Sequence, residues 1–324
     1  MSISTLIAIS HTRYVVVVAT AVLLLLGLAV TLSSRSLYYG YSEPGILPGN
    51  EINRTTIPGL TFPQKIWQTG PPRDRLDPSL AALMSTWESL NPGHQYTFLD
   101  DDAAMQYVTD RFSEYHPNLV ALYTDLDDVI LRADLLRLLC MWADGGVYSD
   151  IDTECLVPID RWIPAEYVEA TSLVIGIVAD LPENPVENRR SEIVQWTFLS
   201  KPSAKYTVKL VEHVVANLHN YAEEKNISIG EIGKTMSVGD VMRITGPVGV
   251  TWALYDTLRY HLRAPFEWYN VTGLREPKLV DDVLFMPINA FGSNQQHSHS
   301  GEAGYGPIFL KHHFSGSWHQ NKNG

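Results

Sequence analysis

Hydrophobic positions alternate between strand-like runs and helix-like spacing from Phe62 onward. Short apolar runs bounded by Gly, Pro or Asn predict strands, and apolar residues recurring every three or four positions predict helices. The predicted strands lie at 65–69, 95–99, 147–148 and 172–178, and the predicted helices at 79–90 and 132–143. The run at 172–178 is apolar throughout, as in a buried parallel strand. This alternation predicts an α/β domain with helices on both faces of the sheet.

The N-terminal part has a different pattern. Residues 14–32 form one apolar run without a charge, and at ~1.5 Å per residue a helix of this length spans about 28 Å, close to a bilayer core. The run is longer than the apolar region of a cleaved signal peptide, about 7–15 residues. We therefore predict a cytoplasmic tail at 1–13, a transmembrane signal anchor at 14–32, a stem at 33–61 and a catalytic domain at 62–324.

Three N-x-S/T triplets follow the predicted anchor, beginning at Asn53, Asn226 and Asn270. Such triplets are acceptors for N-glycosylation, which takes place on the luminal side of the secretory pathway. Together with the anchor they predict a single-pass type II membrane protein with a luminal body.

The composition excludes several classes of protein and of partner. Of 324 residues, 45% are hydrophobic and 19% are charged, which is ordinary for a globular chain. The formal net charge of -12 argues against nucleic acid as a partner. Two cysteines, Cys140 and Cys155, exclude a disulfide-rich scaffold. We expect two buried free thiols, with one bridge between them as the alternative.

The Asp-x-Asp spacing, which can place two carboxylates on one divalent cation, occurs three times. The pair Asp100/Asp102 and the group Asp125, Asp127 and Asp128 precede predicted helices, where acidic residues cap the helix and favour its positive end. The third pair, Asp150 and Asp152, follows the strand at 147–148. Strand alternation continued through these residues predicts that Ile151 points away from both carboxylates, which then face the same way. Paired carboxylates at a strand end predict a Mg²⁺ or Mn²⁺ site.

The apolar helix before this strand carries two charged residues three positions apart, Asp134 and Arg137. They share one helix face. They could form an ion pair closed on itself, or they could present a polar face to a ligand rich in hydroxyl groups.

Four segments in this order resemble one known family. They are PQKIWQTG at 63–70, RADLLRLLCMWADGGVYSDIDTECL at 132–156, DVMRITGPVGVT at 240–251 and KHHFSGSWH at 311–319. Together they are similar to the DXD-containing glycosyltransferase family 32, which holds the fungal initiation-specific α-1,6-mannosyltransferases. The resemblance implies a GT-A-type, Rossmann-like nucleotide-sugar-binding domain, a metal ion and a retaining transfer.

The resemblance also implies roles at the matching positions. Asp150, Asp152 and His312 (in preference to His313) would hold Mn²⁺, or Mg²⁺, and through it the donor diphosphate. Asp134 and Arg137 would contact the donor sugar. Four further residues would line the donor site: Trp67 near the base, Tyr148 in the sugar pocket, and Ser317 and Trp318 over the diphosphate. Trp67 could instead be a core residue, and His312 an ordinary strand histidine.

The most similar branch implies GDP-mannose as donor and an N-glycan core in the Golgi as acceptor. Transfer to a sphingolipid or another acceptor, use of another donor, and a non-catalytic place in a Golgi mannosyltransferase complex are the alternatives. A membrane-anchored hydrolase with paired carboxylates is a further one. It would need an acid and a base about 5–10 Å apart on opposite sides of a bond, and two carboxylates on one face suit a metal better.

Overall fold

The computed structural model describes residues 61–180, 191–293 and 300–315. The predicted tail and anchor, and the predicted stem as far as residue 60, lie outside the described residues. Within the described ranges, no helix is both long and apolar enough to cross a membrane.

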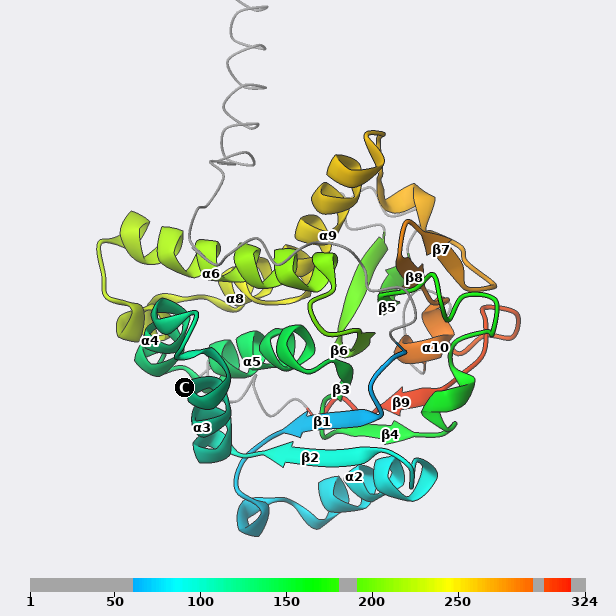
Figure 1. The fold of residues 1–324 in the computed structure, drawn as a ribbon, viewed down its shortest axis with the longest axis horizontal. Helices are drawn as coiled ribbons and strands as arrows, with labels where there is room; N and C mark the ends of the chain where they lie inside the picture. Colours follow the sequence, from blue (N-terminus) through cyan, green and yellow to red (C-terminus); the bar gives the residue numbers. More distant parts are fainter. Residues whose placement is uncertain (1–60, 181–190, 294–299, 316–324) are drawn as a thin grey trace, which may run out of the picture. The chain divides into compact units, whose positions relative to one another are not determined.

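A seven-stranded mixed sheet forms the centre, in the order β2-β1-β3-β6-β5-β8-β7 (Figure 1). The strands, in that order, are β2 (Gln95–Leu99), β1 (Lys65–Thr69), β3 (Gly146–Ser149), β6 (Ser191–Ser200), β5 (Leu173–Asp180), β8 (Val283–Phe285) and β7 (Lys278–Val280). β1 is parallel to both β2 and β3, so the carboxyl ends of these three strands meet at one edge. A second, two-stranded sheet pairs β4 (Thr153–Cys155) with β9 (Leu310–His312).

The helices form the remaining layers of the described domain. They are α2 (Pro78–Leu90), α3 (Asp101–Phe112), α4 (Pro117–Asp125), α5 (Val129–Ala143), α6 (Lys205–Lys225), α7 (Ile232–Thr235), α8 (Val238–Ile244), α9 (Pro247–Leu262) and α10 (Ile288–Gly292). Single 3₁₀ turns lie at η1 (Arg73–Arg75), η2 (Ile159–Arg161), η3 (Ile229–Glu231) and η4 (Trp268–Asn270).

Each face of the sheet has its own core. Alternate residues of β1 and β3 divide between the two faces, as the strand period requires: Trp67 and Tyr148 on one, Ile66 and Val147 on the other. The first core includes residues of α3 to α9, and the second includes Trp87 of α2 and Phe291 of α10. The predicted α/β domain with helices on both faces is confirmed.

The strands predicted at 65–69 and 95–99 are confirmed as β1 and β2, and the helix predicted at 79–90 as α2. The run at 172–178 is a buried strand, β5, but only one of its two neighbouring strands is parallel to it. β5 runs parallel to β8 and antiparallel to β6. The apolar run predicts burial on both faces of the sheet correctly, but burial does not determine the direction of the neighbouring strands.

Gly145 and Gly146 connect the end of α5 to β3. Their φ angles are +65° and +101°. A Cβ on Gly146 would lie 2.5 Å from the carbonyl oxygen of Lys65, so only glycine fits where β3 begins beside β1. The position of β3, and of the residues that follow it, depends on this junction.

Both cysteines are free and buried, as expected. Burial raises the pKa of the Cys155 thiol to about 11, which keeps this thiol protonated at neutral pH.

Candidate active site

Asp150, Ile151 and Asp152 form the tight connection between β3 and β4, at the edge where β1, β2 and β3 end. The expectation that a continuing strand aligns the two carboxylates is wrong, because β3 ends at Ser149 and residues 151–152 form a turn. The backbone N–H and the hydroxyl of Thr153 both donate to the Asp150 carbonyl and close this turn. The carboxylates still come together, through the turn rather than through strand alternation.

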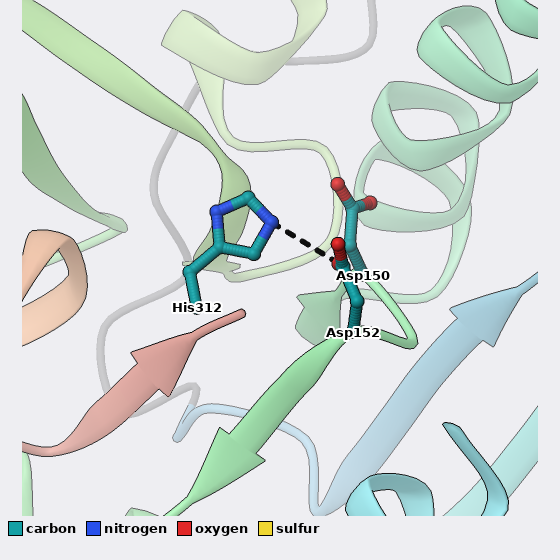
Figure 2. A group of neighbouring side chains, drawn as sticks. All are labelled: Asp150, Asp152 and His312. Atoms are coloured by element: carbon teal, nitrogen blue, oxygen red, sulfur yellow. Dashed lines mark hydrogen bonds and ion pairs between the residues drawn. The ribbon is translucent and has the colours of Figure 1, made fainter. Parts of the chain in front are cut away.

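Asp150, Asp152 and His312 each offer one ligand atom within 4.8 Å of the other two (Figure 2). Figure 2 shows the imidazole of His312 facing the two carboxylates across the gap between β9 and the turn. His312 Nε2 lies 3.1 Å from Asp152 Oδ1. The antiparallel pairing of β4 with β9 sets Thr153 opposite His312. It thereby brings His312 to Asp152, which lies 160 positions earlier in the sequence.

Asp150 is held by cationic and hydroxyl groups on one side. Its Oδ1 accepts a hydrogen bond from the Tyr148 hydroxyl at 2.8 Å and lies 3.5 Å from the Arg137 guanidinium. Burial raises the pKa of Asp150, Arg137 opposes that rise, and the neighbouring Asp152 adds to it. The carboxylate is therefore costly to ionise beside its neighbour, which is the condition that a bound cation relieves.

Asp152 has a different environment. Burial acts to raise its pKa, but hydrogen bonds from His312 and Ser315 outweigh burial and lower the pKa to about 2. Ser315 donates to Asp152 Oδ2 from its backbone N–H at 3.0 Å and from its hydroxyl at 2.9 Å. Asp152 is consequently a carboxylate at any physiological pH.

Packing orients the imidazole of His312. Its ring lies 4.5 Å from the ring of Trp196 and 3.9 Å from that of Phe314, measured between centroids. His313 instead faces away and pairs with Glu154 at 2.9 Å. The structure therefore brings His312, and not His313, to the two carboxylates.

Asp134 and Arg137 of α5 lie beside this group. Their side chains are 9% and 11% exposed, and they form an ion pair at 3.1 Å. The pair is not closed on itself, because Arg137 also approaches Asp150 and donates to the Gln195 carbonyl at 3.1 Å. Thr245, between α8 and α9, donates to Asp134 Oδ2 at 2.7 Å.

Burial raises the pKa of Asp134 to about 6, against the opposing effects of Arg137 and Thr245. Asp134, Arg137 and Asp150 thus form one chain of charges that ends at the candidate metal ligands. Sequence reasoning placed the first two on one helix face, but it could not show that the face meets the Asp-x-Asp turn.

Two of the predicted donor-site residues are deeply buried. Trp67 is 6% exposed, and its indole N–H donates to the Gly145 carbonyl at 2.9 Å, so the structure favours the core interpretation that the sequence left open. Tyr148 is 1% exposed and reaches the site through its hydroxyl. Ser317 and Trp318 lie outside the described residues.

The other Asp-x-Asp pairs do not join a histidine in the metal-ligand group found among the described residues. Asp100 caps α3 by accepting from Ala103 N at 2.9 Å, as predicted. Around the second pair, the capping expectation is confirmed at Asp128 and is wrong for Asp125 and Asp127. Asp125 is the last residue of α4, and Asp127 pairs with Lys234 on the surface at 3.8 Å. Asp128 is the residue that caps α5.

Several residues of the site were not singled out in the sequence. Three of them lie inside the family-like segments, but the resemblance gave them no role: Gln68, Thr245 and Ser315. Trp196 lies outside those segments, and its position beside His312 depends on the pairing of β6 with β3.

The donor set fits a divalent cation. Two carboxylate oxygens and one imidazole nitrogen are ligands suited to Mn²⁺ or Mg²⁺. The Nδ1 atom of His312 is buried without a hydrogen-bond partner among the described residues, so ring packing, rather than a second hydrogen bond, sets the orientation of the imidazole.

Comparison with known proteins agrees with this chemistry. Residues 78–169 match the model of the "Glycosyltransferase sugar-binding region containing DXD motif". This range contains Asp134, Arg137, Tyr148 and the Asp150–Asp152 turn. The chain is thus of the glycosyltransferase class.

Two curated relatives extend the match over most of the chain. The initiation-specific α-1,6-mannosyltransferase of Schizosaccharomyces pombe is 33% identical over 263 residues, which are 79% of this chain and 64% of that protein. The Candida albicans protein of the same name is 30% identical over 284 residues, covering 79% of this chain and 72% of that protein. The chain belongs to the DXD-containing glycosyltransferase family that includes the initiation-specific α-1,6-mannosyltransferases.

The predictions of the family and of the enzyme class, a glycosyltransferase, are confirmed. Among solved structures, PaToxG Glycosyltransferase is similar at 16% identity and a TM-score of 0.41, covering 63% of this chain and 73% of that chain. A likeness at this score assigns neither residues nor substrate.

Proposed function

We propose that this protein is a retaining, metal-dependent glycosyltransferase with a GT-A-type domain, which transfers mannose in α-1,6 linkage from GDP-mannose. The observation that carries the proposal is the convergence of Asp150, Asp152 and His312 beside the Asp134–Arg137 pair. In a member of this family, such a site suits a nucleoside diphosphate held through a cation.

Breaking the bond between the anomeric carbon and the phosphate leaves negative charge on the diphosphate. Asp150, Asp152 and His312 would hold a divalent ion, which would supply Lewis-acid stabilisation of that charge. Arg137 is a fixed cation in a poorly solvated environment next to these three ligands. A preorganised charge in such a place stabilises developing negative charge effectively. Its guanidinium needs no reorganisation, because Asp134 and the Gln195 carbonyl already hold it.

Asp134 is suited to a sugar hydroxyl. One carboxylate oxygen accepts from Thr245 and the other pairs with Arg137, and its pKa of about 6 leaves it mainly ionised at neutral pH. We propose that Asp134 and Arg137 contact the donor sugar, and that Ser317 and Trp318 cover the diphosphate. Because an α-linked donor would give an α-linked product, the transfer would retain configuration.

The names of the relatives support mannose as the sugar and α-1,6 as the linkage. We further propose an N-glycan core as acceptor and a Golgi location, with residues 14–32 as the membrane anchor of a type II protein and the catalytic domain luminal. Whether the protein acts alone or within a mannosyltransferase complex, the proposal assigns catalysis to this chain.

The test is release of nucleotide by the purified protein from GDP-mannose or UDP-sugars, with an N-glycan acceptor and with or without Mn²⁺. We expect Mn²⁺-dependent release of GDP, abolished by chelation and by Asp152→Asn. The matched control is Asp102→Asn, which changes the exposed second aspartate of an Asp-x-Asp pair outside the site. It should leave the release unchanged.

The other outcomes separate the alternatives. Release from a UDP-sugar alone would contradict mannose as the sugar. GDP release with a sphingolipid but not with an N-glycan would contradict the acceptor. Activity that survives chelation would contradict the metal, as expected for a hydrolase. Absence of release from every donor by folded protein would indicate a non-catalytic subunit.

A further inference from the structure

We propose that Gln68 is a positioning residue for the cation site, through the backbone of Asp150. This inference rests on the proposed function, since it assigns Gln68 to the support of the same metal ligands. Gln68 lies on β1, is 1% exposed and belongs to the core strand rather than to the ligand group itself.

The side-chain amide of Gln68 links two neighbours. Its Nε2 donates to the carbonyl oxygen of Asp150 at 3.1 Å, and its Oε1 accepts from the Tyr96 hydroxyl of β2 at 2.6 Å. A carbonyl oxygen can only accept, so the NH₂ must face Asp150 and the amide oxygen must face Tyr96. The amide therefore has one orientation in which both bonds form.

These bonds fix the turn from the β1 side. On the opposite side, the Asp150 N–H donates to the Trp196 carbonyl of β6 at 2.8 Å. The Asp150 peptide is thus held between the two strands that flank β3. A packing contact also holds the turn. The side chain of Ile151 fills the space beside Gly70, where a Cβ added to the glycine would lie 2.8 Å from Ile151 Cδ1.

The position of the backbone decides where the carboxylates point. The Asp150 side chain begins on the residue whose carbonyl Gln68 holds, and Asp152 follows two residues later. A metal site tolerates displacements of only about 0.5 Å before its ligands lose their geometry. Removing the amide would leave the Tyr96 hydroxyl without its acceptor and the turn without its bond to β1.

Gln68 could instead act on stability alone, and a matched residue separates the two roles. Asn91 is also a buried amide, 4% exposed. It donates to the Trp87 carbonyl at 2.8 Å and accepts from Ile159 N at 2.8 Å. The first bond stays within the C-terminal end of α2, and the second joins this end to η2. Both lie outside the metal-ligand group.

The experiment titrates Mn²⁺ into the full-length protein and follows free Mn²⁺ by electron paramagnetic resonance, with melting temperature measured in parallel. The variants are Gln68→Met, Tyr96→Phe and Asn91→Leu. We expect Gln68→Met to weaken Mn²⁺ binding by about tenfold or more, as the loss of an outer-shell partner does. Tyr96→Phe should weaken binding less, and Asn91→Leu should lower the melting temperature without changing the Kd for Mn²⁺.

The results that overturn the inference differ from those that overturn the proposed function. Wild-type affinity for Mn²⁺ in Gln68→Met would show that Gln68 acts on stability alone. Equal weakening in Asn91→Leu would show that binding reports only on stability. If Gln68→Met does not fold, unchanged Mn²⁺ binding in Tyr96→Phe refutes the inference that the Gln68 amide positions the Asp150 turn. If the wild type binds no Mn²⁺, the proposed metal site is wrong and the inference falls with it.

Discussion

Arg137→Met removes the one cation that the described structure places between Asp134 and Asp150. The guanidinium lies 3.1 Å from Asp134 and 3.5 Å from Asp150 and packs 5.2 Å from the centroid of the Tyr148 ring. Methionine keeps most of the apolar stem and removes the charge. The substitution therefore isolates the effect of leaving buried carboxylates without their counter-ion.

The magnitude follows from the burial of the pair. Removing one partner of a buried ion pair costs about 3–5 kcal/mol, because the other charge stays in a poorly solvated place. For a domain of this size, 1 kcal/mol corresponds to about 2–4 °C in melting temperature. We expect Arg137→Met to melt about 6–20 °C below the wild type at pH 7.5.

The loss should depend on pH. Even with Arg137 present, burial raises the pKa of Asp134 to about 6, and without the guanidinium this pKa rises further. At low pH the folded variant can protonate Asp134 and avoid the buried charge. The difference between variant and wild type should therefore shrink as the pH falls from 7.5 towards 5.5.

The matched control is Arg243→Met. Arg243 and Asp240 form an ion pair with the same three-residue spacing, at 2.6 Å, but Arg243 is 51% exposed. Surface pairs of this kind contribute less than about 1 kcal/mol. Differential scanning fluorimetry of both variants measures the contrast. Equal small shifts for the two would refute the reasoning that burial makes the Arg137 pair different.

Three further predictions concern single positions. Asp134→Asn should flatten the pH dependence of the melting temperature. The raised pKa of Asp134 favours the folded state at low pH, and this stability is lost as the pH rises from 3.8 to about 6. An unchanged slope of melting temperature against pH in the variant would contradict this prediction. Gly146→Ala should destabilise by well over about 1 kcal/mol in urea unfolding, because its Cβ would meet the Lys65 carbonyl, whereas Gly273→Ala, with open space around it, should cost less. Asp100→Ala should cost about 1 kcal/mol through the lost cap of α3 in the same assay, while a cost as small for Asp100 as for the exposed Asp102→Ala would argue against the cap.

The sequence predicts well where local pattern and burial agree. β1, β2 and α2 have clear boundaries because Gly, Pro and Asn interrupt their apolar runs, and the Gly145–Gly146 junction ends α5 where expected. Strand direction in β5 is not encoded in its own residues, since an apolar run is equally compatible with parallel and antiparallel neighbours. That information lies in the course of the whole chain.

The candidate site shows the same division. The Asp-x-Asp spacing together with its place after a predicted strand indicates Asp150 and Asp152, but a turn and not a continuing strand carries the two carboxylates. His312 was taken from the resemblance, and only the pairing of β4 with β9 brings it to Asp152. The support from Gln68 and Trp196 depends on strand order, which no local pattern records.

The most direct measurement is anomalous-scattering crystallography of the protein grown with Mn²⁺ and GDP. The account predicts one manganese peak within bonding distance of a carboxylate oxygen of Asp150, a carboxylate oxygen of Asp152 and Nε2 of His312, with the diphosphate on the side of Arg137. A peak at Asp100 and Asp102, or GDP bound at a distance from the Asp150–Asp152 turn, would contradict it.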